Sequence, residues 1–465
     1  MNMINVRRLT VMTFLGAGML SSISAQISPL QVDTLKETKI PDQWDLQSCI
    51  DYAKEQNITI RKNRITAAST QIDVKTAKAA MFPSLSFSTG QQVVNRPYQE
   101  TSSRVSGSEI ISSNSKTSYN GNYGLNASWT LYNGNKRLKT IQQEKLNNQM
   151  AELDVATSEN NIQESIAQVY IQILYAAESV KVNENTLQVS IAQRDRGQEL
   201  LNAGSIAKSD LAQLEAQVST DRYQLVTAQA TLEDYKLQLK QLLELDGENE
   251  MNIYLPALSD ENVLAPLPTK RDVYISALSL RPEIEASKLN VEASELGINI
   301  AKSSYFPTIS LSAGIGTNHT SGSDFTFGEQ VKNGWNNSIG LSVSVPIFNN
   351  RQTKSAVQKA KLQYETSMLS LLDEQKALYK TIESLWLDAN SAQQRYAAAN
   401  EKLKSTQISY ELISEQFNLG MKNTVELLTE KNNLLQAQQE QLQAKYMAIL
   451  NTQLLKFYQG DQLAI

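Results

Sequence analysis

The sequence predicts an α+β membrane protein with two tandem structural repeats, each carrying two transmembrane β-strands and long coiled-coil helices. Three observations support this fold class. The segment AKAAMFPSLSFSTG at residues 77–90 recurs as AKSSYFPTISLSAG at residues 301–314. Segments of about ten residues alternate apolar with small polar side chains, which is the period of a β-strand. Long stretches between them contain neither Gly nor Pro, the residues that weaken or break helices.

The duplication extends over most of the chain. Residues 131–134 (LYNG) match 347–350 (IFNN), and residues 201–204 (LNAG) match 417–420 (FNLG). A repeat this long is a large folding unit used twice. The predicted organisation is a signal peptide (1–25), an N-terminal extension (26–43), a first repeat (44–250), a linker (251–270), a second repeat (271–460) and a C-terminal tail (461–465). The strands are expected at about 83–93 and 119–131 and at about 307–316 and 337–348.

The N-terminus has the features of a secretory signal. Arg7 and Arg8 precede an apolar stretch, residues 9–20, that is too short to span a bilayer. Ala25 suits cleavage before Gln26. The alternative is that this segment stays attached as an anchor.

The composition argues against several classes of function. A formal net charge of −5 does not favour a nucleic-acid partner. The single cysteine, Cys49, has no partner for an internal disulfide and is expected to be a buried thiol. The single histidine, His319, is expected in a solvated hairpin loop with no second metal ligand nearby. No Walker or Rossmann glycine pattern follows a strand, so the sequence predicts no enzyme, no catalytic residue, no cofactor and no metal site.

The alternating segments have one apolar face and one face of small, nearly uncharged residues. Tyr123, Leu125 and Trp129, for example, alternate with Gly124 and Asn126. Small polar residues inside and apolar residues outside are typical of an outer-membrane β-barrel. Aromatic residues gather where the strands meet the helices, as in an interfacial girdle: Phe82, Trp129, Tyr132, Phe306 and Phe348.

The helical stretches are unusually long. Residues 136–195 and 352–418 contain no Gly or Pro, and at 1.5 Å per residue they would reach about 90–100 Å. An apolar stripe with three- and four-residue spacing runs from Leu211 to Leu242 and is typical of a coiled-coil seam. Asp221 is the one charged residue on that stripe.

Four strands are too few to close a barrel in a membrane. Eight is the smallest common number, and unpaired strand edges in lipid cost several kcal/mol per backbone group. The barrel therefore has to be assembled from several chains, with eight strands from two copies or twelve from three. From the residues alone, the prediction is an oligomeric outer-membrane channel with helices extending to one side.

In this order and within two repeats, several short motifs are specific to one family. They are Trp44-Asp45-Leu46, the two Phe-Pro junctions, Arg281-Pro282-Glu283 and the two glycine-centred helix turns. With these motifs the chain resembles the outer membrane efflux protein family, the TolC-like channels of Gram-negative bacteria, from Trp44 to about Gly460. The resemblance implies a homotrimer with a 12-stranded β-barrel on an α-helical barrel, located in the cell outer membrane and extending into the periplasm.

The resemblance also implies a function and partners. The expected function is that of an exit duct for passive export of small toxic compounds, working with a periplasmic adaptor (membrane fusion) protein and an inner-membrane RND or ABC transporter. One alternative is the outer-membrane component of type I protein secretion. Another, of a different class, is a secreted coiled-coil structural or adhesive protein. The strand faces distinguish these, because an adhesin needs no lipid-facing apolar surface.

The same resemblance assigns roles to residues of the helix turns. Gly204 and Gly420 would lie at the closed periplasmic tip, where the adaptor docks. Asp210, Lys422 and Phe417 match the positions of a gate lock. Lys422 stands where Arg is usual and Phe417 has no hydroxyl group, so the lock is expected to be weak.

A pore constriction is implied on the helix that follows the second turn. Glu426 matches one acidic position of the family, and Thr429 stands where a second Asp is often found. The resemblance therefore predicts weaker cation selectivity than in a relative with two acidic rings. The alternative for Glu426 is a solvated carboxylate on a helix.

Overall fold

The computed structural model describes residues 41–98, 102–106, 109–113, 116–246, 251–256, 263–321, 323 and 325–464. The chain divides into two units, Met1–Asp42 and Gln43–Ile465. The predicted signal peptide and almost all of the N-terminal extension lie outside the described residues. All of the described helices and strands belong to the second unit.

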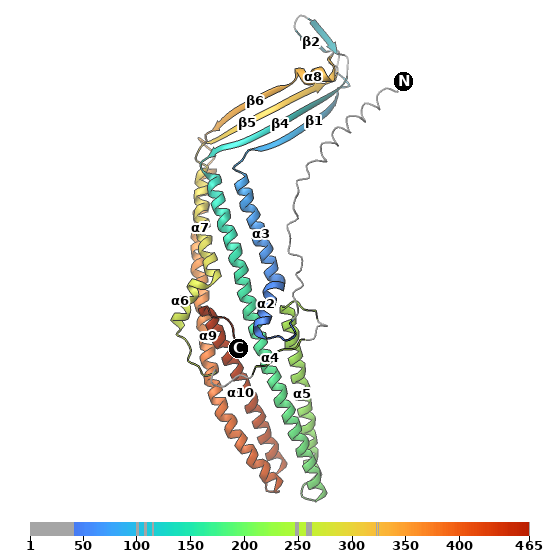
Figure 1. Ribbon diagram of the computed structural model, residues 1–465, viewed down its shortest axis with the longest axis vertical. Helices are drawn as coiled ribbons and strands as arrows, with labels where there is room; N and C mark the ends of the chain where they lie inside the picture. The colour runs from blue at the N-terminus through green and yellow to red at the C-terminus, as the bar shows by residue number, and fades with distance from the viewer. Residues whose placement is uncertain are drawn as a thin grey trace, which may run out of the picture. The chain divides into compact units, whose positions relative to one another are not determined.

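Long helices account for most of the second unit (Figure 1). Two of them, α4 and α9, have 67 residues each, or about 100 Å at 1.5 Å per residue, as the sequence predicts. The described helices are α2 Leu46–Gln56, α3 Ile58–Ala79, α4 Lys136–Asn202, α5 Lys208–Leu242, α6 Lys270–Leu280, α7 Pro282–Ser303, α8 Phe327–Asn333, α9 Gln352–Asn418 and α10 Thr424–Gln459.

The helices of each repeat form an antiparallel hairpin. α5 packs along α4 in the first repeat, and α10 packs along α9 in the second. The shorter α3 and α7 lie against the sheet-proximal parts of α4 and α9, and α7 also contacts α4, which joins the two repeats. Among the described residues, no helix is both long enough and apolar enough to cross a lipid bilayer.

Two strands from each repeat form one antiparallel sheet in the order β1-β4-β5-β6. The strands are β1 Ser84–Asn95, β4 Thr117–Asn133, β5 Thr308–Thr320 and β6 Asn336–Ser344. A separate hairpin, β2 Ser102–Ser106 and β3 Glu109–Ser113, lies within the first long loop. The central pair β4–β5 joins the two repeats, so the fold needs both copies of the duplicated segment.

The sheet has the two faces that the alternating segments predict. Pairs such as Leu125–Ile315 put apolar side chains on one face, and pairs such as Asn126–Gly314 put small polar residues on the other. The apolar face is open in the single chain, with Leu85 69% and Ile339 84% exposed. An exposed apolar surface of this extent marks an interaction with lipid or with another chain.

The structure differs from the sequence-based expectation in several places; β5, for example, continues to Thr320 instead of ending at about residue 316. The fourth strand ends at Ser344 instead of about residue 348, because Pro346 has no N–H with which to continue a strand ladder. The expectation that His319 is a solvated loop residue is wrong. His319 lies in β5 and is only 7% exposed, because α8 covers that end of the strand.

The main apolar core lies where α2, α4, α9 and α10 meet. Trp44, Tyr170 and Tyr396 are each 1% exposed there. Cys49 is buried in the same cluster, and burial raises the pKa of its thiol to about 12. This agrees with the prediction of an inert, buried cysteine.

Candidate functional site

The two helix turns at the ends of the hairpins have the same geometry. Gly204 has a φ of 73° and Gly420 a φ of 74°, values that residues with a side chain resist. Gly204 N–H donates to Leu201 O and Gly420 N–H to Phe417 O, both at 2.9 Å. These bonds close the last turns of α4 and α9 and start the return helices. The sequence match between LNAG and FNLG is therefore a match of backbone conformation.

An acidic side chain caps the helix after each turn. The carboxylate of Asp210 accepts from Ala207 N–H at 3.0 Å, at the start of α5. At the start of α10, Glu426 accepts from Asn423 N–H at 3.2 Å, while the Asn423 side chain accepts from Glu426 N–H at 2.9 Å. This reciprocal arrangement is a capping box, and it explains locally why both repeats keep an acid at this position.

Lys422 forms its ion pair within its own helix turn. Its Nζ lies 2.5 Å from Oε1 of Glu426, and the two side chains are 33% and 40% exposed. Two hydrogen bonds hold the pKa of Glu426 below its ordinary value. The bond from the Lys422 side chain has the larger effect, and the bond from the Asn423 N–H adds to it. The charge predicted for the constriction is thus accompanied by an opposite charge in direct contact with it.

The structure brings some of the predicted gate residues together and not others. Lys422 and Glu426 meet, whereas the described part of the chain contains no ion pair between Lys422 and Asp210. Phe417 is buried, with 3% exposure. Thr429 is exposed one turn beyond Glu426, and its hydroxyl donates to Val425 O at 2.8 Å. The lock between Asp210 and Lys422 stays a prediction.

A buried ion pair that sequence reasoning missed joins both hairpins. Lys431 of α10 contacts Asp221 of α5 and Ser190 of α4, and the three residues are 2–3% exposed. Gln217 donates to the second carboxylate oxygen of Asp221 at 2.9 Å. Burial lowers the pKa of Lys431, against the opposing effect of Asp221. The available signal was Asp221 itself, a charge on an otherwise apolar helix stripe.

The predicted interfacial aromatics lie where the sheet meets the helices, and most are exposed. Phe82 is 73%, Phe306 52% and Phe348 84% exposed, while Trp129 is 38% exposed and its Nε1 donates to Met81 O at 2.7 Å. Tyr132 follows an irregularity in the β4–β5 register. Exposed aromatic side chains with a tethered indole N–H suit a boundary between apolar and aqueous surroundings.

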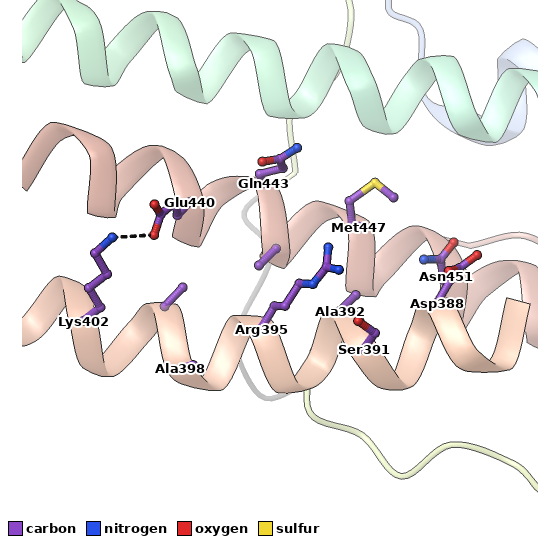
Figure 2. A pocket seen from close by; sticks show the side chains of 12 residues that line it. Asp388, Ser391, Ala392, Arg395, Ala398, Lys402, Glu440, Gln443, Met447 and Asn451 are labelled. Atoms are coloured by element: carbon purple, nitrogen blue, oxygen red, sulfur yellow. Dashed lines mark hydrogen bonds and ion pairs between the residues drawn. The ribbon is translucent and has the colours of Figure 1, made fainter.

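A groove of about 550 Å³ runs between α9 and α10 (Figure 2). Lys402 and Glu440 pair across one end of it at 2.7 Å. Asp388 and Arg395 also line the groove, and among the described residues neither forms an ion pair. Met447 adds an apolar side chain to the α10 wall. The groove therefore offers both signs of charge and an apolar contact to a neighbouring helix.

An apolar sheet face carried on paired long helices from two repeats defines a channel-type membrane fold. The sequence model of the family "Outer membrane efflux protein" matches residues 49–244 and 273–460. The chain belongs to this family. It is thus an outer-membrane protein of a channel family and not an enzyme, and the family resemblance stated from its motifs is confirmed.

Curated relatives and solved structures agree with this assignment. The chain is 24% identical to outer membrane efflux protein BepC of Brucella suis over 63% of this chain and 61% of that protein. It is 24% identical to outer membrane protein TolC of Escherichia coli K12 over 61% and 58%. The alignments thus span about three fifths of these relatives' lengths.

Among solved structures, CusC superposes with a TM-score of 0.75 at 19% identity, covering 90% of this chain and 92% of that one. VceC from Vibrio cholerae superposes with a TM-score of 0.73 at 16% identity, covering 90% and 97%. At these identities the likeness is one of fold.

Proposed function

We propose that this protein is the outer-membrane exit duct of a tripartite efflux pump, through which small toxic compounds pass passively across the periplasm and outer membrane. The observation that carries the proposal is the four-stranded sheet, apolar on one face and small and polar on the other, mounted on helices of about 100 Å. In a closed barrel the small residues would line a water-filled lumen. We also propose that the repeats at 44–250 and 271–460 are the two structural halves of the chain, each contributing two strands to the sheet and its own long helices.

The working unit is a homotrimer with a 12-stranded barrel. β1 and β6 are the edges of the sheet, and open edges are not tolerated in lipid. Pairing β1 of one copy with β6 of the next closes the barrel without any other segment. The groove between α9 and α10, with charges of both signs on its walls, supports a helix contact between copies.

The partners are a periplasmic adaptor and an inner-membrane RND or ABC transporter. Relatives named "Toxin and drug export protein A" and "Alkaline protease secretion protein AprF" support a role in a multi-component export system. The tips at Gly204 and Gly420 are the docking points, because each presents a short, defined helix turn. Protein secretion is the second candidate function, favoured by the name of AprF alone. A secreted adhesive protein does not fit membership of an outer-membrane family.

Charge at the tip sets ion selectivity. In a trimer the ring of Glu426 carboxylates would be accompanied by an equal number of Lys422 ammonium groups 2.5 Å away. The ring is then close to neutral, and the constriction is expected to be weakly cation-selective.

Planar-bilayer recordings test this constriction. Glu426→Gln keeps the cap but leaves Lys422 unbalanced, so the reversal potential should shift towards anions. Lys422→Gln should shift it towards cations. Strong cation selectivity that survives Glu426→Gln contradicts the assignment of Glu426 to the pore.

The pH dependence of selectivity follows from the same contact. Because the pKa of Glu426 is lowered, its carboxylate remains charged at pH values where an ordinary glutamate is half protonated. Selectivity should move towards anions as the pH falls, and the midpoint of that change should lie below 4.5, the ordinary value for a glutamate. In Glu426→Gln this acid transition should be absent.

A further inference from the structure

A cluster of aromatic rings lies at the loop end of the apolar sheet face, opposite the predicted girdle. The His319 ring lies 5.3 Å from Tyr119, 5.9 Å from Tyr123 and 5.0 Å from Phe327, measured between ring centroids. Tyr119 and Tyr123 belong to β4, His319 to β5 and Phe327 to α8. Pairs of this kind add to the stabilisation from burial alone.

Gly121 makes room for this cluster. It pairs with His319 across β4 and β5, and a Cβ at Gly121 would lie 2.2 Å from His319 Cε1 and 2.6 Å from Gln91 Oε1. The imidazole therefore lies over a position without a side chain, between the two tyrosines. Gln91 in turn accepts from the Tyr119 hydroxyl at 2.6 Å, which fixes that ring.

The short helix α8 is attached to this same face of the sheet. Thr317 and His319, whose side chains point to the apolar face, both contact it: Thr317 Oγ1 donates to Val331 O at 2.7 Å, and Phe327 packs on His319. Thr320 N–H donates to Gln330 Oε1 at 2.9 Å. The Thr317 and His319 contacts thus attach α8 to the apolar-face side of β5.

Large aromatic side chains on and beside α8 nevertheless stay exposed. Phe325 is 58%, Phe327 45% and Trp335 57% exposed. Phe327 packs on His319, on the same face as Ile315, and Trp335 directly precedes β6, which carries Ile339 on that face.

The spacing of the two aromatic levels matches a membrane. Trp129 at the helix end and Tyr119 at the loop end lie ten residues apart on β4. At ~3.4 Å per residue and a tilt of ~45°, this separation is about 24 Å along the membrane normal. The apolar band of outer-membrane barrels is about 25 Å tall and has an aromatic girdle at each interface.

We propose that α8, Trp335 and the His319 cluster form a lipid-binding surface that sits at the headgroup–acyl boundary of the outer leaflet of the outer membrane. The occupant of this surface is membrane lipid. The inference rests on the proposed function, because it requires the apolar sheet face to be inserted in the bilayer.

Tryptophan fluorescence in vesicles tests the surface directly. The chain has four tryptophans, so variants that keep only one of Trp44, Trp129 or Trp335, with Phe at the other positions, report on single sites. Each full-length variant is reconstituted in phosphatidylcholine brominated either near the headgroup or near the bilayer centre. Trp335 should lose about half of its fluorescence, and more with the shallow bromines, as expected for an interfacial aromatic.

The other two variants separate the possible failures. Trp44 is 1% exposed in the helical core and should not be quenched. Trp129, at the opposite girdle, should be quenched by shallow bromines. If Trp129 is quenched and Trp335 is not, the lipid-binding surface is wrong and the exit duct stands. If neither is quenched, membrane insertion of the sheet is wrong as well.

A second pair of variants tests whether the His319 cluster holds α8. Gly121→Ala in the Trp335-only chain displaces the His319 imidazole and loosens α8. The quenching of Trp335 should then fall about twofold, because its contact with the membrane interface is weaker. Gly124→Ala is the matched control, because its Cβ would have no neighbour nearer than 3.4 Å. Equal quenching in both variants overturns the role of the cluster.

Discussion

Backbone conformation at a few residues explains why the two repeats resemble each other. The strand-to-helix turn of each repeat has two consecutive residues with positive φ, Gly134 and Asn135 in the first and Asn350 and Arg351 in the second. The motif match between LYNG and IFNN therefore predicts a shared turn, even though the residues differ. Of these four residues, Arg351 is the least suited to the turn, because a long side chain with a φ of 65° is strained.

Exchanging the turn residues between repeats tests this strain. Arg351→Asn should raise the free energy of unfolding by about 0.5–1 kcal/mol, because Asn tolerates the left-handed conformation. The reciprocal change, Asn135→Arg, should lower it by a similar amount. Urea unfolding of the detergent-solubilised protein, followed by circular dichroism, measures both. No change in either variant means that the turns relax without cost.

At the scale of elements, the helix hairpins are held together by buried polar contacts as well as by apolar seams. The Ser190–Asp221–Lys431 cluster ties α4, α5 and α10 together with both charges almost fully excluded from water. A buried pair of this kind adds little stability over apolar residues of similar size, but removing one partner strands a charge. Because the cluster lies between the two hairpins, it fixes how the helices of one repeat align with those of the other.

Removing one charge should therefore be far more damaging than removing both. Lys431→Met should cost about 3–5 kcal/mol, whereas the double change Asp221→Leu with Lys431→Met should recover most of that loss. The control is Lys402→Met, whose pair with Glu440 is 42% exposed on each side and should cost at most about 1 kcal/mol. Thermal unfolding in detergent ranks the variants, and a Lys431→Met effect as small as the control contradicts the burial argument.

In the whole molecule, the sheet has one apolar face that is open in the single chain and two edge strands, β1 and β6, that each pair on one side only. The helices bury their apolar residues against one another in a core near α2 and α10, but the apolar sheet face remains open. Lipid covers the face, and neighbouring copies satisfy the edges, in the proposed trimer. Stability of the assembled channel then depends on which face of a strand is changed.

Neighbouring residues of β4 make this dependence measurable. Leu125→Lys places a charge on the apolar face near the middle of the membrane and should cost about 2–4 kcal/mol. Asn126→Lys places the same charge on the polar face and should be tolerated. The readout is the amount of heat-modifiable oligomer in the outer-membrane fraction. Equal yields from the two variants contradict the assignment of the faces.

Features that depend on local pattern follow from the amino-acid sequence alone. Strand faces follow from a period of two, helix lengths from uninterrupted stretches, and tip turns from glycines that take positive φ, so the fold and its family were predictable from residues such as Leu125 and Gly204. Which distant side chains meet depends on how the helices and strands pack. Packing buries Lys431 against Asp221 and places His319 over Gly121 under α8, whereas the pair Lys422–Glu426 is local, four residues apart in the chain. For Lys431 and His319 the partners lie far away in the chain, and contacts between segments brought together only by folding leave no periodic signal in the sequence.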